Sequence, residues 1–199
     1  MARPIAKDYE FKRDHILNSA AMLFAREGFA GASMAELAHE CQISKANIYH
    51  YYSGKDALLF DLLNAYLRAL HQKLTSLKLD GFPPKQKLFL LVREILLAYQ
   101  GMDHQHQVQL NEMQHLPSAQ QDILRSYQSD MISILRNVIA EIAPAIEAKE
   151  KAKLHAVTMS VFGMLNWFYM WNRQEGTEAR ENYAKVVTEL TLKGIASDH

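Results

Sequence analysis

The chain has 199 residues, 49% of them hydrophobic, which is enough to bury a core without a disulfide or a structural metal ion. Its 22 basic and 22 acidic side chains give a formal net charge of zero, so the composition lends no support to nucleic-acid binding. No apolar run reaches the length that crosses a bilayer, so we expect no association with a membrane.

The cysteine content and the N-terminus indicate a compartment. Cys41 has no second cysteine with which to form an intramolecular disulfide, which is typical of reducing conditions. The first residues contain no apolar segment of the kind found in a signal peptide. We therefore expect a cytoplasmic protein.

Residues 8–27 form the first predicted helix, because their apolar positions recur with the helical period. Gly28 follows this segment and is a typical residue at a helix end. Ser33 and Glu36 have the spacing of a capping box, in which each side chain bonds the backbone amide of the other residue. This pattern predicts a second, short helix that ends near Glu40.

Ser44 is the predicted N-cap of a third short helix, which begins at Lys45 and ends near Tyr51. Residues 41–43 leave room for little more than a turn between the second and third helices. A long fourth helix is expected at about 55–77, where leucines recur with the helical period.

The rest of the chain also predicts helices, separated by proline and glycine. The strongest break is the Asp-Gly-Phe-Pro-Pro run at residues 80–84. No segment alternates between apolar and polar residues as a strand does. We therefore predict an all-α fold of about nine helices, the last five of them near residues 85–101, 104–115, 118–142, 149–172 and 177–196.

Residues 33–52 have the pattern of a helix-turn-helix, in which two short helices are joined by a tight turn. The second helix of this motif must present polar side chains to the major groove of DNA. In the third predicted helix Ala46 and Ile48 can pack inward, whereas five side chains can project: Lys45, Asn47, Tyr49, His50 and Tyr51. Lysine and tyrosine suit phosphate oxygens, and asparagine and lysine can bond to base edges.

Two runs of sequence resemble the DNA-binding domain of TetR-family repressors. They are FAREGFAGASMAELA at residues 24–38 and ISKANIYHYYSGKDAL at residues 43–58. The resemblance implies an all-helical homodimer with an N-terminal three-helix DNA-binding domain at 1–56. It also implies a C-terminal helical domain at 57–199 that binds a small ligand and dimerises.

The resemblance further implies which residues meet operator DNA. They are Ser33, Ser44, Lys45, Ala46, Asn47, Tyr49, His50, Tyr51 and Lys55. Ser33 and Lys55 correspond to family positions that contact phosphate, and residues 45–47 to positions that read bases. Tyr49 and Tyr51 correspond to aromatic residues at the DNA backbone.

The sequence departs from the family pattern at two places. Ser33 stands where threonine is commoner, which keeps the hydroxyl group. Cys41 and Gln42 stand where a small Ala-Gly pair is usual, which makes a tight turn harder to form. Tyr52 corresponds to the aromatic residue that closes the small core of the domain.

Several polar residues allow other interpretations. The three tyrosines at 49, 51 and 52 could be core aromatics of a small bundle, although the flanking pattern favours DNA contact for the first two. A cluster of possible metal ligands comprises Asp103, His104, His106, Glu112 and His115. Since His104 and His106 do not share a helix face, we favour solvated or pocket-lining histidines and expect no metal ion. We also expect no catalytic set and no cofactor, because the motifs that carry them are missing from the sequence.

The C-terminal segment is rich in methionine and aromatic residues. Because residues 149–172 are apolar on nearly every face, we expect them to form a two-fold, four-helix interface with 177–196 of each subunit. The residues predicted to line an internal ligand pocket are Leu96, Tyr99, Met102, Leu110, Met113, Tyr127 and Phe162.

These patterns together predict a DNA-binding repressor that a small molecule releases from its operator. Residues 163–171 resemble a TetR subgroup that controls fatty-acid, aromatic-acid or steroid catabolism, which suggests a hydrophobic, acyl-CoA or aromatic-acid effector. The alternative is a helical ligand-binding or scaffold protein that no longer binds DNA. Residues 1–56 support that alternative, because they contain seven basic and seven acidic residues. An all-helical enzyme is less favoured, since no acid–base pair is evident.

Overall fold

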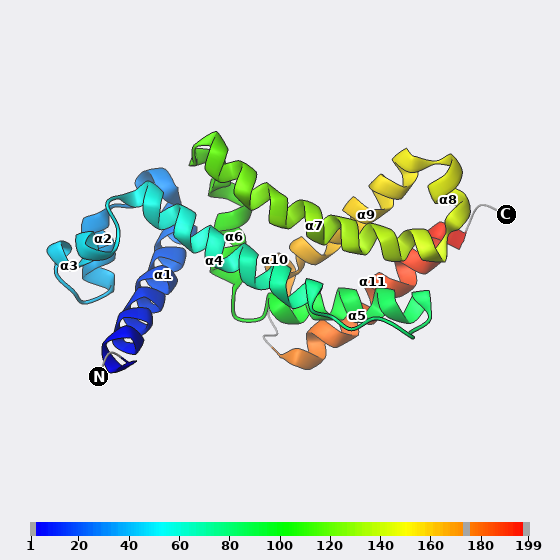
Figure 1. Cartoon of the computed structure of the whole chain (residues 1–199), viewed down its shortest axis with the longest axis horizontal. Helices are drawn as coiled ribbons and strands as arrows, with labels where there is room; N and C mark the ends of the chain where they lie inside the picture. The colour runs from blue at the N-terminus through cyan, green and yellow to red at the C-terminus, as the bar shows by residue number, and fades with distance from the viewer. Residues whose placement is uncertain (1–2, 173–175, 197–199) are drawn as a thin grey trace. The chain divides into compact units, whose positions relative to one another are not determined.

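A computed structural model describes residues 3–172 and 176–196 of the chain, and every described element is helical (Figure 1). The helices are α1 (Arg3–Gly31), α2 (Met34–Glu40), α3 (Lys45–Tyr51), α4 (Lys55–Thr75), α5 (Pro84–Ala98), α6 (Asp103–Glu112), the 3-10 turn η1 (Met113–His115), α7 (Ser118–Ile142), α8 (Pro144–Lys149), α9 (Lys151–Asn166), α10 (Phe168–Trp171) and α11 (Thr177–Ala196). The predicted all-α class is confirmed. Within the described ranges, no helix combines the length and apolarity needed to cross a membrane.

The chain divides into two compact units. The N-terminal unit contains residues 1–67 and 104–125, and the C-terminal unit contains residues 68–103 and 126–199. Helices α4 and α7 each contribute one part to both units. The chain therefore crosses between the units three times, within α4, at the start of α6 and within α7.

The N-terminal unit has a core of residues from each of its first four helices. Ile16 and Phe24 of α1, Leu37 of α2, Ile48 of α3 and Leu58 of α4 are all nearly or fully buried. Burial of a side chain of this size contributes about 1.5–3 kcal/mol. The core therefore fixes α2 and α3 against the longer helices.

Helix α6 also belongs to the N-terminal unit, where it contacts α1. The Gln105 side chain donates a hydrogen bond to Asn18 (2.9 Å), and Gln107 donates one to the carbonyl oxygen of Ala25 (2.9 Å). His106 is buried, and its Nδ1 lies 2.9 Å from the Tyr66 hydroxyl. Among the described residues, no three or more His, Cys, Asp or Glu side chains lie close enough together to hold a metal ion.

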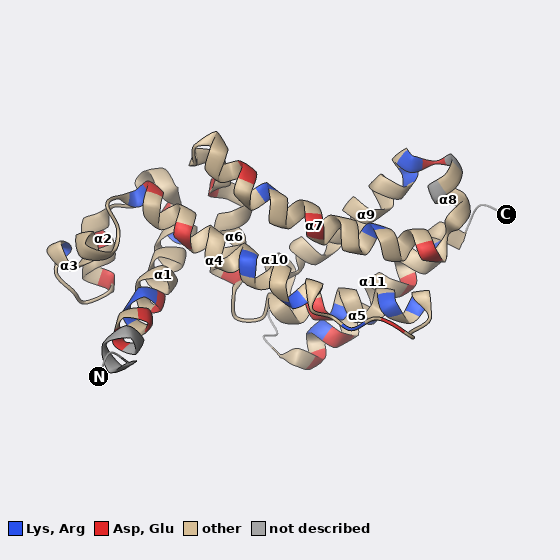
Figure 2. Ribbon diagram, in the orientation of Figure 1, with Lys and Arg blue, Asp and Glu red and all other residues tan. Residues whose placement is uncertain are grey.

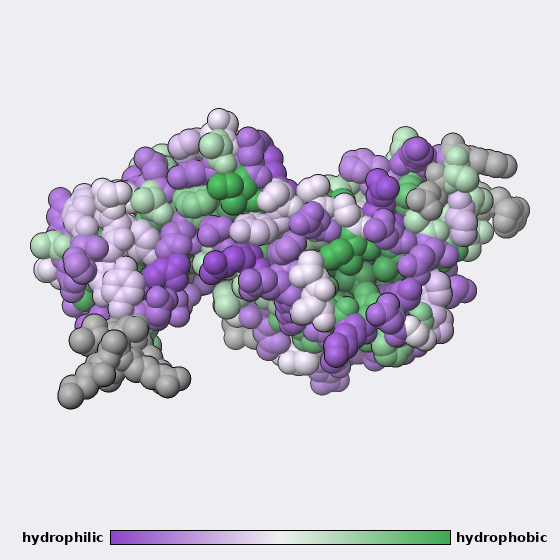
Figure 3. Space-filling model, in the orientation of Figure 1, coloured by the Kyte–Doolittle hydropathy of each residue, from purple (hydrophilic) through white to green (hydrophobic). Residues whose placement is uncertain are grey.

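The C-terminal unit is organised around α5 and α11, which pack along much of their length. Leu88, Leu91 and Ile95 of α5 are buried, as are Ala184 and Val187 of α11. Helix α9 packs against both of them. In the view of Figure 3 the surface of this unit is mainly polar but carries an apolar patch between α5 and α7.

One predicted helix is interrupted. The sequence predicts a continuous helix at 149–172, but the structure breaks it twice. The first break, at Glu150, separates α8 from α9, and the second, at Trp167, separates α9 from α10. At this second break Phe168 is 2% exposed and stacks on Tyr183, with ring centroids 4.8 Å apart. Phe168 thus packs against α11 directly after the break at Trp167, a tertiary contact that the local sequence does not indicate.

Candidate nucleic-acid interface

The turn between α2 and α3 is held by local backbone contacts. Gln42 has a φ of 55°, a left-handed conformation that side chains disfavour and glycine adopts readily. The Ile43 amide bonds the Ala38 carbonyl at 3.0 Å. Ser44 then caps α3, since its hydroxyl accepts the Asn47 amide at 3.1 Å. The tight turn therefore forms without the usual glycine, at a cost in backbone strain.

Helix α3 buries one residue and exposes most of the others. Ile48 is fully buried, whereas Lys45, Ala46, Asn47, Tyr49 and His50 are exposed and Tyr51 is half-buried. The prediction that Ala46 packs inward is wrong, because Ile48 alone supplies the buried face of this two-turn helix.

The exposed face of α3 has the chemistry of a groove-reading helix. It contains no Asp or Glu, and Lys45 supplies its positive charge (Figure 2). The Lys45 ammonium lies 5.9 Å from the centre of the Tyr49 ring. Lysine, asparagine and tyrosine on one exposed face can bond to phosphate oxygens and to base edges.

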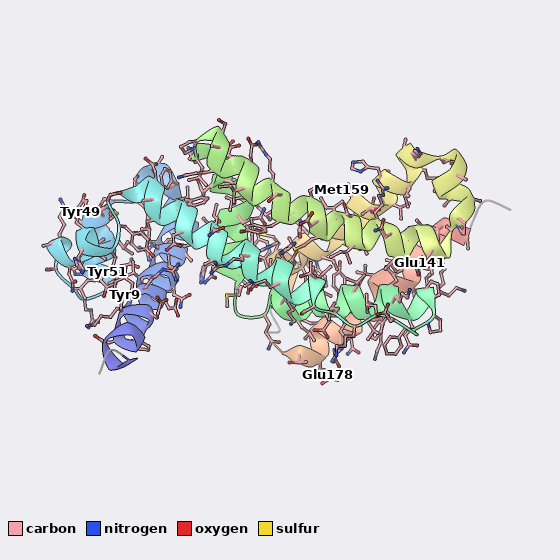
Figure 4. All side chains as sticks on the ribbon, viewed as in Figure 1. Tyr9, Tyr49, Tyr51, Glu141, Met159 and Glu178 are labelled. Atoms are coloured by element: carbon pink, nitrogen blue, oxygen red, sulfur yellow. The ribbon has the colours of Figure 1, made fainter. Side chains whose placement is uncertain are left out.

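Tyr9 is a residue of this surface that sequence analysis missed. Its ring stacks on Tyr51, with centroids 4.8 Å apart and an interplanar angle of 24°. Figure 4 shows Tyr9 of α1 beside Tyr51 of α3, with Tyr49 on the same helix. No local pattern indicated this contact, since the two residues are brought together only by tertiary packing. The stack restricts the orientation of Tyr51.

A polar cluster ties the end of α3 to α1 and α4. The buried Tyr52 hydroxyl donates to Asp61 at 2.7 Å, and Arg13 makes two hydrogen bonds to the same carboxylate at 2.6 and 3.0 Å. Burial, followed by the hydrogen bond to Asp61, raises the pKa of Tyr52 well above its usual value. The prediction of a core role for Tyr52 is confirmed.

Lys55 is already engaged within the unit. Its ammonium donates to the carbonyl oxygens of Phe29 (2.6 Å) and Ala32 (2.7 Å) and lies 4.7 Å from the centre of the Phe29 ring. These carbonyls follow Gly28, whose φ of 73° and ψ of 158° interrupt α1. Lys55 therefore joins the start of α4 to the end of α1, a role that its sequence position did not reveal.

Ser33 begins α2 through the predicted capping box, which is confirmed. The Glu36 amide donates to the Ser33 hydroxyl (3.2 Å), and the Glu36 carboxylate accepts the Ser33 amide (2.8 Å). Hydrogen bonding of the carboxylate to the Ser33 side chain, followed by that to the Ser33 backbone amide, lowers the pKa of Glu36. Ser33 is exposed, so a phosphate oxygen could compete with the Glu36 carboxylate for its hydroxyl proton.

The seven residues predicted to line a ligand pocket belong to both units. Leu110 and Met113 lie in the N-terminal unit and the others in the C-terminal unit. Met102 and Leu110 are about 40% exposed, and Met113 and Tyr127 are partly exposed. The buried members are Leu96, Tyr99 and Phe162, and the Tyr99 hydroxyl donates to Asn166 at 3.0 Å.

A groove lies elsewhere in the C-terminal unit, between α9 and α11. Its volume is about 270 Å³, and it is lined by Lys153, Ala156, Val157, Ser160, Val161, Met164, Leu190, Thr191, Gly194 and Ile195. None of the seven predicted pocket residues is among them. Met159, labelled in Figure 4, and Leu190 remain exposed on these two helices by 41% and 56%.

Comparison with known proteins agrees with this architecture. Residues 16–62 match the family described as bacterial regulatory proteins, tetR family. Residues 81–195 match the family described as tetracyclin repressor-like, C-terminal domain. Together the two matches include most of the helices from α1 to α11.

Individual relatives extend over nearly the whole chain. The transcriptional repressor NicS of Pseudomonas putida is 25% identical over 96% of this chain and 95% of its own length. The crystal structure of a TetR-family transcriptional regulator from Bordetella parapertussis is 30% identical, covers 90% of this chain and 93% of its own, and has a TM-score of 0.84.

A more distant structure shares the fold. AibR, solved in complex with isovaleryl coenzyme A and operator DNA, is 23% identical, covers 91% of this chain and 98% of its own, and has a TM-score of 0.73. Both the N-terminal and the C-terminal part of the chain match TetR-family models, and the helical structure presents an exposed α3. This chain therefore belongs to the TetR family of bacterial regulatory proteins.

Proposed function

We propose that this protein is a dimeric transcriptional repressor that binds operator DNA through α3 and is released by a small-molecule effector. The observation that carries the proposal is the exposure of Lys45, Asn47, Tyr49 and His50 beside a fully buried Ile48. A DNA-binding domain at residues 1–56 would contain α1, α2 and α3. The similarity to the repressor NicS over nearly the full length supports repression.

Neutral charge does not argue against DNA binding by this surface. Arg13 and Arg26 are paired with carboxylates inside the N-terminal unit, whereas the α3 face contains Lys45 and no acid. Charge is thus sorted by position, so that a domain without net charge still offers a positive face to phosphate.

Dimerisation is proposed through α9 and α11. Leu190 lines the mostly apolar groove between these helices, and Met159 and Val186 are further exposed apolar residues on the same two helices. Apolar surface of this kind is covered in a stable two-fold interface. Two copies of α3 separated by about 34–36 Å, one turn of DNA, could then enter successive major grooves.

The proposed effector is a small hydrophobic or acyl-CoA-type molecule that binds the C-terminal helices. AibR, which shares the fold, was solved with isovaleryl coenzyme A, and the apolar patch between α5 and α7 offers a hydrophobic surface. Release requires that the effector bind the DNA-incompetent state more tightly, and near-complete switching takes about 5.5 kcal/mol of preference.

A gel shift with the DNA that flanks the protein's own gene tests DNA recognition. Asn47→Ala is expected to weaken binding to the specific fragment by about 1–3 kcal/mol and to leave binding to random DNA unchanged, because Asn47 is placed to bond base edges. Lys85→Ala is the control, since it removes an exposed basic residue of the C-terminal unit that lies outside α9 and α11.

Two results would contradict the proposal. An equal loss on specific and random DNA would exclude a base-reading role for Asn47. A wild-type protein that binds no fragment better than random DNA would instead favour a helical ligand-binding or scaffold protein without DNA recognition.

A further inference from the structure

Arg180 is a buried cation in the C-terminal unit. It lies near the start of α11, and 4% of its surface is exposed. Removing a guanidinium group from water costs free energy unless its charge and its N–H donors find partners. The contacts of Arg180 therefore show whether the group is satisfied.

Those contacts leave part of the guanidinium unused. Nη1 donates to the Leu96 carbonyl at 3.2 Å, while Nη2 lies 3.7 Å from Asp103 Oδ1, beyond hydrogen-bond distance. The Phe168 ring lies 5.1 Å from Cζ. Among the described residues, neither Arg180 Nε nor Asp103 Oδ1 has a hydrogen-bond partner, although both atoms are buried.

A carboxylate is the hydrogen-bond acceptor that best suits the N–H groups of Arg180. Guanidinium N–H groups form a planar fork that bonds both oxygens of a carboxylate. Asp103 already places one carboxylate nearby, but about 45% of its side chain is exposed and it does not complete the fork. A second carboxylate could therefore compete with Asp103 for Arg180.

An aromatic cluster adjoins Arg180 through Phe168. Phe168, Trp171 and Tyr183 contact one another with ring centroids 4.8–5.2 Å apart, and Phe168 presents its ring to Arg180. A ligand that carries both an anionic group and a ring or short alkyl chain would match a cation beside such a cluster.

We propose that Arg180 binds the carboxylate of a small organic acid, which takes the place of the Asp103 carboxylate. The inference rests on the proposed effector control and narrows the effector to the organic acids. It assigns Arg180 a role in ligand recognition that the sequence did not indicate.

The proposal also suggests how binding reaches the DNA-binding helices. Asp103 is the first residue of α6, and the chain enters the N-terminal unit directly after it. Further along α6, Gln105 and Gln107 bond Asn18 and Ala25 of α1. Release of Asp103 from Arg180 therefore acts on the start of a helix that supports α1.

Calorimetric titration of the DNA-free, full-length protein with matched acids and amides tests the proposal. The probes are benzoate against benzamide and hexanoate against hexanamide. At least one acid is expected to bind about ten-fold or more tightly than its amide, because a charge-assisted hydrogen bond to a buried guanidinium is lost in the amide. Arg180→Gln is expected to remove this preference.

Two further variants keep the test decisive if Arg180→Gln folds poorly. Asp103→Asn is expected to tighten acid binding several-fold, because it removes the competing carboxylate. Glu178→Gln, which removes an exposed carboxylate from the same helix, is expected to leave acid binding unchanged.

Equal binding of acids and amides, or no binding of either, would overturn the proposal. Such a result is expected if a water molecule bridges Arg180 and Asp103 instead of a ligand carboxylate. Unchanged acid affinity in Asp103→Asn would overturn it as well. A protein that prefers the acids but recognises no DNA would refute the proposed repressor function alone. Specific DNA binding without acid preference would refute this inference alone.

Discussion

Among the single residues around α3, one has a strained backbone and two others have their side-chain hydrogen bonds made. Gln42 takes a left-handed conformation so that α3 can follow α2 within a few residues. Ser44 and Tyr52, at the two ends of α3, are by contrast fully engaged through Asn47 and Asp61. The helix is thus fixed at both ends, while the turn before it carries the cost.

Gln42→Gly is expected to stabilise the protein by about 0.5–1 kcal/mol. Glycine removes the steric cost of the left-handed conformation, and the gain exceeds its greater loss of backbone entropy on folding. Urea denaturation of wild type and variant checks the change in the free energy of unfolding. Gln100→Gly, outside the strained turn, is expected to give no stabilisation, and an unchanged or lower stability of Gln42→Gly would show that the turn is unstrained.

Among the helices, the ends that are fixed by local capping bonds could be predicted from the sequence, whereas those fixed by tertiary packing could not. The bounds of α2 and α3 follow from Ser33, Glu36 and Ser44, whose capping bonds are made within three residues. The break at Trp167 was missed because it depends on Phe168 packing against α11. The pocket residues were chosen by apolar character, which does not determine their neighbours.

The ammonium of Lys55 illustrates the same distinction. The resemblance to the TetR family implied a phosphate contact for Lys55, whereas the fold directs its ammonium to the carbonyls of Phe29 and Ala32. The two roles are separable by experiment, because one stabilises the DNA-free protein and the other contributes only when DNA is bound.

Lys55→Ala is expected to lower the free energy of unfolding of the DNA-free protein by about 1–3 kcal/mol, since two partly buried carbonyls lose a charged donor. If Lys55 also contacts phosphate, the slope of log affinity against log salt falls by about one. Urea denaturation and salt-dependent DNA binding measure the two effects. Lys12→Ala, which removes an exposed lysine paired with Asp8, should change stability little, and an equal response of both variants would exclude the carbonyl role.

At the scale of the whole molecule, the covalent path between the two units offers a route for control. The chain crosses between them within α4, at the start of α6 and within α7. Arg180 contacts Asp103 at one of these crossings, and Lys55 begins the helix that makes another. Two-state control of DNA binding requires only that effector and operator prefer different arrangements, and operator must then weaken effector binding in return.

The proposed recognition of operator DNA also requires a dimer, and Leu190→Glu tests the proposed dimer interface. Leu190 is 56% exposed and lines the groove between α9 and α11, so a charge there leaves the fold of one subunit intact. In a dimer formed by these helices, the new carboxylates would be buried without partners, so we expect the variant to be monomeric in light scattering. Specific DNA affinity should fall by about 100-fold or more, because the second half-site contact is no longer intramolecular. Phe82→Glu places the same charge on an exposed apolar residue outside both helices and should remain dimeric. A Leu190→Glu protein that is still a dimer with full operator affinity would place the two-fold interface on another surface.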